Sequence, residues 1–460
     1  MTLIRIKRGL NLPLPGGIDS TVLLQAPEPA HVALLPQQSW GIKVQMLAQE
    51  GDRVLVGSPL FCDRRDPRVL FTSPAAGVVE RVVRGEKRVA LAVVVRPDNF
   101  NEQAPQVARL DANRASRAEL VEALAASGLW PALRQRPFDR VAHSDEVPRS
   151  IFVTAMDTEP LAVSPREAVR GREDAFRAGL KALVKLSEKG VWLCSSAEED
   201  WSDLNTTNGQ PIEGVRARQF RGPHPAGLAG THIHFLDPVG VKRKVWHVAA
   251  QDVADIGEFL SSGLLPTRRR VAIVGPAASK TAWVSTRRGA DFASFESYAD
   301  RSQGSVRFIS GSPLAGRTAA PGSDAGFLGL WDRQITLLRD ETVRDFLGWS
   351  VPLGRRWSIT NVYPGKFLFP RKMRFDTDLN GSPRAIVPIG VWERVMPLDV
   401  LPTPLIKALA SGEMEDAEKL GVLELAEEDL ALCEFVDQSK TPVTSLLRTM
   451  LTRIEKENQA

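Results

Sequence analysis

The first hundred residues alternate short apolar runs with turn signals. Runs such as VQMLAQEGDRVLVGSPLF and RVLFTSPAAGVVERVVRGEKRVALAVVV are broken by Gly-, Pro- and Asp-containing clusters at residues 50–52 and 73–77. Short apolar runs bounded by such clusters are typical of strands. The pattern therefore predicts an all-β unit from Ile4 to about Val95.

The middle of the chain changes to a helical period. Residues 111–133 predict a helix that ends near Gly128. Residues 149–154 predict a buried strand, residues 166–189 a strong amphipathic helix, and residues 191–194 a second strand. A strand, a helix and a strand at this spacing predict a βαβ unit and hence an α/β domain.

Residues 222–238, GPHPAGLAGTHIHFLDP, concentrate glycine, proline and three of the six histidines. The pattern predicts a loop of fixed conformation that leads into a strand at residues 231–236. On a strand, His232 and His234 would point to one face, and His224 could join them as a third metal ligand. No carboxylate or cysteine completes a recognised ligand spacing, so we favour histidines that hydrogen-bond to backbone groups of the loop.

Composition limits the possible functions. A chain of 460 residues exceeds the size of a single core and predicts three or four domains. The net charge of +4 comes from interspersed basic and acidic residues without a long basic run, which argues against nucleic-acid binding. No window approaches the ~20 apolar residues of a membrane span, and the N-terminus lacks an export signal, so we expect a chain that does not cross a bilayer.

Two segments make the chain recognisable. The stretches SGLWPALRQRPFD and GPHPAGLAGTHIHFL, followed by a predominantly helical region over residues 388–460, resemble the A subunit of the sodium-translocating NADH:quinone oxidoreductases, which are bacterial respiratory complexes. No single motif is specific, but their joint order is. The resemblance extends from Ile4 to Glu457, and together with the patterns above it implies a multidomain α+β fold.

We expect four domains. The pattern GDxVxxGxxL followed by SPxxGxV resembles carrier domains, which predicts a barrel-sandwich (biotinyl/lipoyl-like) β domain at residues 1–105. A Rossmann-like α/β domain with the central Gly/Pro/His loop is expected at residues 106–262, and a C-terminal helical domain at residues 379–460. Residues 306–320, VRFISGSPLAGRTAA, resemble the soluble-ligand-binding β-grasp signature, so a β-grasp (SLBB-like) domain is expected at residues 263–378.

Each domain lacks the residues with which a cofactor would be bound. A carrier domain presents a lysine at its hairpin, whereas residues 62–67 are CDRRDP. A dinucleotide site needs G-x-G-x-x-G after the first strand, whereas residues 155–160 are AMDTEP, with two carboxylates that repel phosphate. Cys433 stands alone, and Asp437 lies where the family commonly has a second cysteine, so an iron–sulfur cluster is excluded. We therefore expect no metal site and no cofactor bound by this chain.

The resemblance implies a quinone association for two stretches, residues 34–40 (LLPQQSW) and residues 136–140 (RPFDR). A quinone head needs an aromatic or apolar slot and one or two donors to its carbonyl oxygens, and these stretches could supply both. The same residue types serve ordinary interfaces, so docking or core packing is the alternative. A histidine of the 222–238 loop could also donate a proton to a reduced quinone. The candidate quinone-binding residues are Leu35, Gln38, Trp40, Arg136 and Phe138.

The resemblance further implies a peripheral position on the cytoplasmic face of the bacterial inner membrane. The complex oxidises NADH, reduces ubiquinone and exports Na⁺, and this chain alone would hold no complete active site and no catalytic residue. NADH, FAD, FMN, riboflavin and iron–sulfur sites would belong to the five other subunits, B to F, with direct contact expected to the membrane-embedded B subunit. Two hypotheses stay open: the chain contacts ubiquinone, or it is a purely structural scaffold that caps the membrane subunits. The missing cofactor motifs favour the second.

Overall fold

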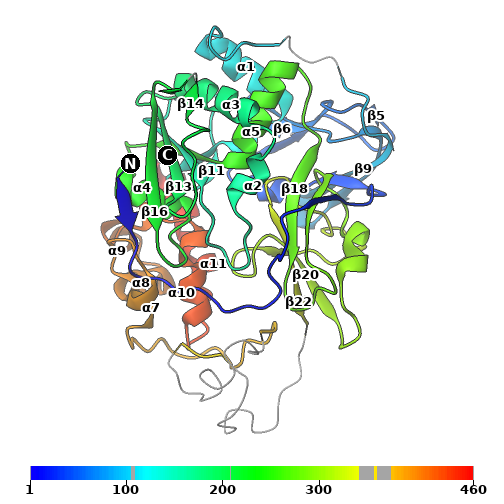
Figure 1. The fold of residues 1–460 in the computed structure, drawn as a ribbon. Helices are drawn as coiled ribbons and strands as arrows, with labels where there is room; N and C mark the ends of the chain where they lie inside the picture. Colours follow the sequence, from blue (N-terminus) through cyan, green and yellow to red (C-terminus); the bar gives the residue numbers. More distant parts are fainter. Residues whose placement is uncertain (1, 105–108, 208, 341–356, 360–374, 459–460) are drawn as a thin grey trace.

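The computed structural model describes residues 2–104, 109–207, 209–340, 357–359 and 375–458, in a chain rich in both helices and strands (Figure 1). The strands between residues 32 and 99 form two small sheets, which confirms the predicted all-β unit. Residues 62–67 form the predicted hairpin, and the rings of Phe61 and Phe71 stack behind it with centroids 4.5 Å apart. One sheet has the order β3 (Val32–Leu34), β9 (Ala90–Asn99), β8 (Ala76–Arg84) and β5 (Arg53–Val54), and the other β4 (Val44–Met46), β6 (Pro59–Asp63) and β7 (Asp66–Thr72).

A seven-stranded sheet forms the centre of the second unit. Five of its strands are parallel, in the order β1-β16-β13-β12-β17, and the last four of these have the order of a Rossmann-like sheet. The predicted strand–helix–strand unit is therefore confirmed. The full order is β1 (Leu3–Arg5), β16 (Val215–Arg221), β13 (Val191–Ser196), β12 (Ile151–Ala155), β17 (Val245–Ala249), β10 (Arg134–Arg136) and β11 (Arg140–Val141).

Two of the predicted helices are shorter than expected. The helix predicted at residues 166–189 is divided into α2 (Pro165–Val169) and α3 (Glu173–Leu186), because Gly171 has a φ of +76° between them. The helix predicted at residues 111–133 is α1 (Arg117–Ser127). A capping box of Ser116 and Glu119 starts it, and Gly128 ends it in the left-handed conformation.

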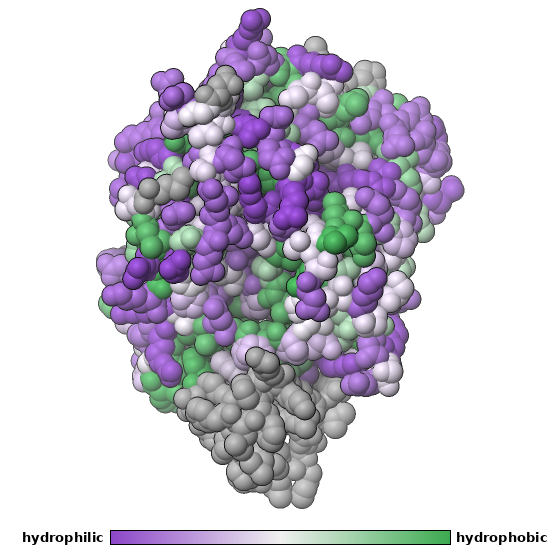
Figure 2. Space-filling view, viewed as in Figure 1, coloured by the Kyte–Doolittle hydropathy of each residue, from purple (hydrophilic) through white to green (hydrophobic). Residues whose placement is uncertain are grey.

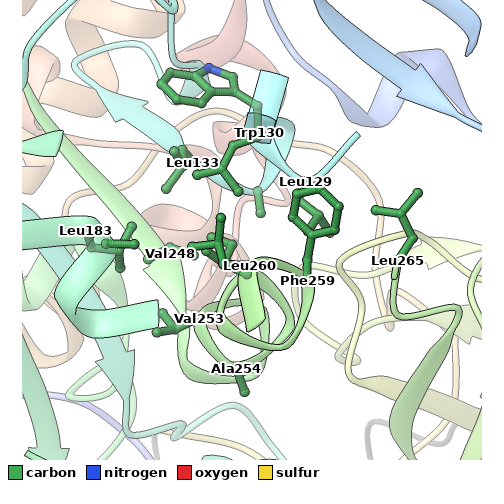
Figure 3. Close-up of a cluster of buried hydrophobic side chains, with 14 of the residues drawn as sticks. Leu129, Trp130, Leu133, Leu183, Val248, Val253, Ala254, Phe259, Leu260 and Leu265 are labelled. Atoms are coloured by element: carbon green, nitrogen blue, oxygen red, sulfur yellow. The ribbon is translucent and has the colours of Figure 1, made fainter. Parts of the chain in front are cut away.

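One face of the seven-stranded sheet is covered by α3 and α5 (Ala250–Ser262). Leu183 of α3, Val248 of β17 and Leu260 of α5 point toward one another in the large buried cluster that also contains Trp130 (Figure 3). Trp130 lies in a short 3-10 helix, η3 (Trp130–Ala132), and its indole N–H donates to the carbonyl of Ala142 at 2.7 Å. This cluster fixes the strands whose ends carry the candidate site residues.

The strand predicted at residues 231–236 is wrong, because this segment is the helix α4 (Ala229–Leu236). The physical reason is topological. β16 and β17 are parallel strands of one sheet with two strands between them, and parallel strands need a crossover connection, usually a helix. Ala229 and Ile233 are buried one helical turn apart against the sheet face opposite α3 and α5.

The third unit is built on a six-stranded mixed sheet. The predicted strand of VRFISGSPLAGRTAA is present as β20, and it turns at Gly311, which has a φ of +100°. The sheet packs its own cluster of buried side chains, among them Phe292, Phe295 and Phe308. Its order is β2 (Leu23–Gln25), β19 (Ala282–Arg287), β18 (Arg268–Val274), β22 (Gln334–Arg339), β20 (Val306–Ser310) and β21 (Arg317–Thr318); a separate hairpin consists of β14 (Thr206–Thr207) and β15 (Gln210–Pro211).

The C-terminal residues form short helices that surround a cluster of their own, and Figure 1 shows them below the seven-stranded sheet. Pro402 occupies the first turn of α8, where its missing N–H has no intrahelical partner to lose. Gly412 and Gly421 separate the following helices in the left-handed conformation. The helices are α7 (Val391–Val395), α8 (Pro402–Ser411), α9 (Met414–Lys419), α10 (Glu427–Val436) and α11 (Val443–Asn458).

The face of the molecule shown in Figure 2 is mostly polar. Hydrophilic side chains cover most of the face shown in Figure 2, and hydrophobic ones gather in small separate patches. In the described part of the chain, no helix is both long enough and apolar enough to cross a membrane.

Candidate functional site

The two predicted quinone stretches lie against each other. The backbone N–H of Val141 donates to the carbonyl of Trp40 at 3.2 Å. Gly41 has a φ of +82° and lies very close to Arg140. A Cβ atom at Gly41 would be 2.7 Å from Cβ of Arg140. Phe138, in the turn between β10 and β11, has a φ of +78°, which residues with side chains rarely adopt. The fold therefore joins segments that are about a hundred residues apart in the sequence.

Arg448 of α11 connects these two segments. Its Cζ atom lies 4.4 Å from the ring centroid of Trp40, and its Nη1 donates to the carbonyl oxygen of Phe138 at 2.9 Å. The Nε and Nη2 atoms bind both carboxylate oxygens of Glu427, in the first turn of α10. We call Trp40, Phe138, Arg448 and Glu427 the aromatic joint. Sequence reasoning missed Arg448 and Glu427, since it described residues 388–460 only as predominantly helical.

Arg136 is buried rather than available to a ligand. Its Nη1 donates to Asp429 Oδ2 at 2.8 Å and to the carbonyl of Glu424 at 3.3 Å, and its Nη2 donates to Glu428 Oε1 at 3.0 Å. Burial alone would lower the pKa of Arg136, but the charges of Asp429, Asp139 and Glu428 raise it above its usual value. These contacts tie the sheet to α10.

Leu35 and Gln38 lie near the joint with different exposure. The Leu35 side chain is buried in a small cluster with Ala92, Val94 and Phe327. Gln38 ends a short 3-10 helix, η1 (Pro36–Gln38), and is half-buried. Its amide nitrogen lies against Gly329, where a Cβ would come within 2.4 Å of it. Leu35 thus packs in the core, while Gln38 is half-buried against Gly329.

The three histidines of the 222–238 loop have separate surroundings. His224 is buried, and its Nδ1 lies 3.3 Å from Thr158 Oγ1; burial lowers its pKa to about 4. His232 packs on Phe220 with ring centroids 4.4 Å apart, and burial lowers its pKa to about 3. Since both groups favour the neutral form, neither is arranged as a proton donor near pH 7.

His234 points away from His232, because residues two apart on a helix lie on nearly opposite faces. The N–H of Asp399 donates to His234 Nε2 at 3.0 Å. In the neutral ring the hydrogen is then on Nδ1, which donates to Glu424 Oε2 at 2.6 Å. His234 therefore links α4 to the C-terminal helices. Within the described ranges, no group of three or more His, Cys, Asp or Glu residues is arranged to hold a metal ion.

The turn at the carboxyl end of β12 is hydrogen-bonded to two other parts of the chain. Asp157 accepts from Arg333 Nη2 at 2.8 Å, and the N–H of Gly227 donates to Thr158 Oγ1 at 2.8 Å. A Cβ at Gly227 would lie 2.7 Å from the nitrogen of Thr158, so the 222–238 loop rests directly on this turn. Burial, with a further contribution from Asp157, raises the pKa of Glu159 to about 8. A Rossmann-like sheet binds dinucleotides at the carboxyl ends of its strands, and here Arg333 and the 222–238 loop contact the turn at that end of β12.

The single cysteine of the helical region is enclosed. Cys433 of α10 is buried, and desolvation raises the pKa of its thiol above the usual range. Asp437 ends α10 and accepts from the N–H groups of Ser439 at 2.9 Å and Thr441 at 2.7 Å. The aspartate thus orders the loop before α11, which explains a carboxylate at this position in structural terms.

Comparison with known proteins identifies the family. The family model described as "NqrA N-terminal barrel-sandwich hybrid domain" matches residues 4–98, and that described as "NqrA second alpha/beta domain" matches residues 115–265. The A subunit of the Na(+)-translocating NADH-quinone reductase of Rhodopirellula baltica is 41% identical over 456 residues, 98% of each chain. The proteins of the same name from Yersinia pestis and Pseudomonas aeruginosa (strain UCBPP-PA14) are 41% and 43% identical, over 99% of this chain and 100% of theirs. The chain belongs to the family formed by the A subunits of the Na⁺-translocating NADH-quinone reductases.

Proposed function

We propose that this chain is a peripheral subunit that contacts ubiquinone at the aromatic joint and binds neither flavin nor nicotinamide. The observation that carries the proposal is the convergence of Trp40 and Phe138, which Arg448 links directly. A flat aromatic face beside hydrogen-bonding groups suits a quinone head. The unfavourable φ of Phe138 supports the same interpretation, because such backbone is concentrated at functional sites.

The proposed lack of a nucleotide cofactor rests on the residues and contacts of the turn after β12. Asp157 and Glu159 stand where a pyrophosphate would need backbone N–H groups, and Arg333 neutralises Asp157 from the third unit. The hairpin at residues 62–67 offers no lysine for a carrier cofactor. We infer that NADH, FAD, FMN, riboflavin and iron–sulfur groups are held by the other five subunits, B to F.

The proposal also gives the chain a location. We propose that it lies at the cytoplasmic face of the inner membrane against the membrane-embedded B subunit, where it contributes to ubiquinone reduction coupled to Na⁺ export. The four domains proposed from the sequence, including the β-grasp (SLBB-like) domain at residues 263–378 and the helical domain at residues 379–460, then form a covering layer over the membrane subunits.

A purely structural scaffold is the second candidate. It is favoured by Arg136, which is fully engaged by carboxylates, and by Arg448, which already covers the face of Trp40. In that case the joint would only fasten the C-terminal helices to the sheet.

Calorimetric titration of the isolated full-length chain with a short-chain ubiquinone separates the two candidates. Saturable binding that Trp40→Ala and Phe138→Ala each weaken about tenfold would support quinone contact. Titration heats no larger than those of dilution would mean that the chain does not bind ubiquinone, and would support the structural scaffold. Separately, a flavin absorption band in the purified chain, or saturable NADH binding, would refute the cofactor-free assignment.

A further inference from the structure

Arg448 covers one face of the Trp40 ring. The guanidinium carbon lies 4.4 Å from the ring centroid, and the same group contacts the Phe138 carbonyl and the Glu427 carboxylate. A planar ligand cannot stack on a ring face that a guanidinium already occupies. We call the state in which Arg448 covers Trp40 the closed state. A quinone cannot stack on this ring face while the protein is in the closed state.

The surroundings of Trp40 leave Arg448 as the group that moves. The backbone of Trp40 is bonded to Val141, and the following residue, Gly41, is packed against Arg140. Arg140 is itself held by Glu455 Oε1, 3.0 Å from its Nη1. Arg448 is a long side chain that is itself only 13% exposed, but its partner Glu427 is 36% exposed, so that water can reach the carboxylate that anchors it.

We propose that Arg448 is a gate over Trp40, which swings aside to let a flat quinone ring stack on the indole. The inference rests on the proposed quinone contact and concerns the regulation of that same site. Arg448 is in this sense a positioning residue. It sets the fraction of molecules whose Trp40 face is open, while Trp40 and Phe138 make the contact.

The expected effect follows from population shift. The apparent affinity of a ligand falls in proportion to the fraction of protein in the competent state. A partly exposed cation–aromatic contact favours the closed state about threefold to fivefold, and the bonds to Phe138 and Glu427 act in the same direction. Removing the gate should therefore strengthen quinone binding. A residue that only fastens the helices would, when removed, leave binding unchanged or weaken it.

The test is calorimetric titration of the isolated full-length chain with ubiquinone-1. Arg448→Ala should bind about fivefold more tightly than the unaltered chain, and in a Trp40→Ala background the same substitution should have no effect. Arg453→Ala is the matched control, because Arg453 is an exposed arginine of the same helix whose Nη1 donates to the Gly412 carbonyl at 3.1 Å. The affinity of Arg453→Ala for ubiquinone-1 should equal that of the unaltered chain. Glu427→Gln keeps the gate but loosens its anchor, and should give a smaller increase; it remains informative if Arg448→Ala does not fold.

The outcomes distinguish failure of the gate from failure of the quinone contact. Weaker or unchanged binding in Arg448→Ala and Glu427→Gln, with binding still weakened in Trp40→Ala, overturns the gate and keeps the quinone contact. Absence of saturable binding in every variant overturns both. Tighter binding that persists without Trp40 also overturns the gate, since the effect would then arise elsewhere.

Discussion

Arg136 and Asp429 form an ion pair between the seven-stranded sheet and α10, with Nη1 2.8 Å from Oδ2. The side chains are 0% and 1% exposed, so neither charge is balanced by water. Removing one partner of such a pair leaves the other charge buried and uncompensated. The resulting loss of folding stability is therefore far larger than for a surface pair.

Arg136→Met should lower the free energy of unfolding by about 3 kcal/mol, since Asp429 would lose its buried partner. The measurement is urea unfolding of the isolated chain. Arg114→Met is the control, because Arg114 is 91% exposed and its Nε lies 3.9 Å from the Asp111 carboxylate; a change within about 0.5 kcal/mol is expected there. Equal effects of the two substitutions would show that the ion pair of Arg136 and Asp429, at 2.8 Å, does not hold the C-terminal helices to the sheet.

Glu159→Gln should alter the dependence of stability on pH. The folded pKa of Glu159 is about 8, above its ordinary value of 4.5, so between these values the folded state keeps a proton that the unfolded state loses. Its contribution is fully present below about pH 4.5 and is lost as pH rises toward 8. The variant, which cannot ionise, should therefore be more stable than the parent at pH 8, by roughly 4 kcal/mol. Thermal unfolding at about pH 5, 6.5 and 8 measures this; a difference independent of pH would refute the assignment.

The cysteines should be unreactive in the folded chain. Cys62, Cys194 and Cys433 are all buried, and burial raises the pKa of each thiol. Because the thiolate is the reactive form, a thiol reagent such as Ellman's reagent should label none of them within minutes at about pH 8 and all three in urea. Rapid labelling of Cys433 under native conditions would contradict its enclosure in α10.

The domain pattern was predictable because it depends on local periodicity. Short runs before Val95 predict strands, and the spacing of residues 149–194 predicts the βαβ unit, both of which are confirmed. The residues 231–236 mislead because six alternating residues fit a strand, while the chain must cross from β16 to β17. Tertiary topology determines that this segment is a helix, and a short window of the sequence does not contain that information.

The candidate site shows the same limit. Trp40 and Phe138 are found by resemblance, but their contact through Arg448 depends on packing between α11 and the sheet. Arg136 has the residue type of a carbonyl donor, yet burial and three carboxylates give it a structural role. Whether a side chain can contact a ligand or forms an interior ion pair depends on its partners in the fold, and the sequence does not give these partners.

The most direct test of the proposed quinone contact is the KM for ubiquinone-1 of the assembled reductase carrying Trp40→Ala in this chain. If Trp40 contacts the substrate, KM should rise at least about fivefold with intact assembly. Phe435→Ala is the control, because this partly exposed aromatic of α10 lies outside the aromatic joint and packs on Trp357, 5.6 Å between centroids; its KM should match the parent. An unchanged KM in the fully assembled Trp40→Ala enzyme would contradict the proposed quinone contact.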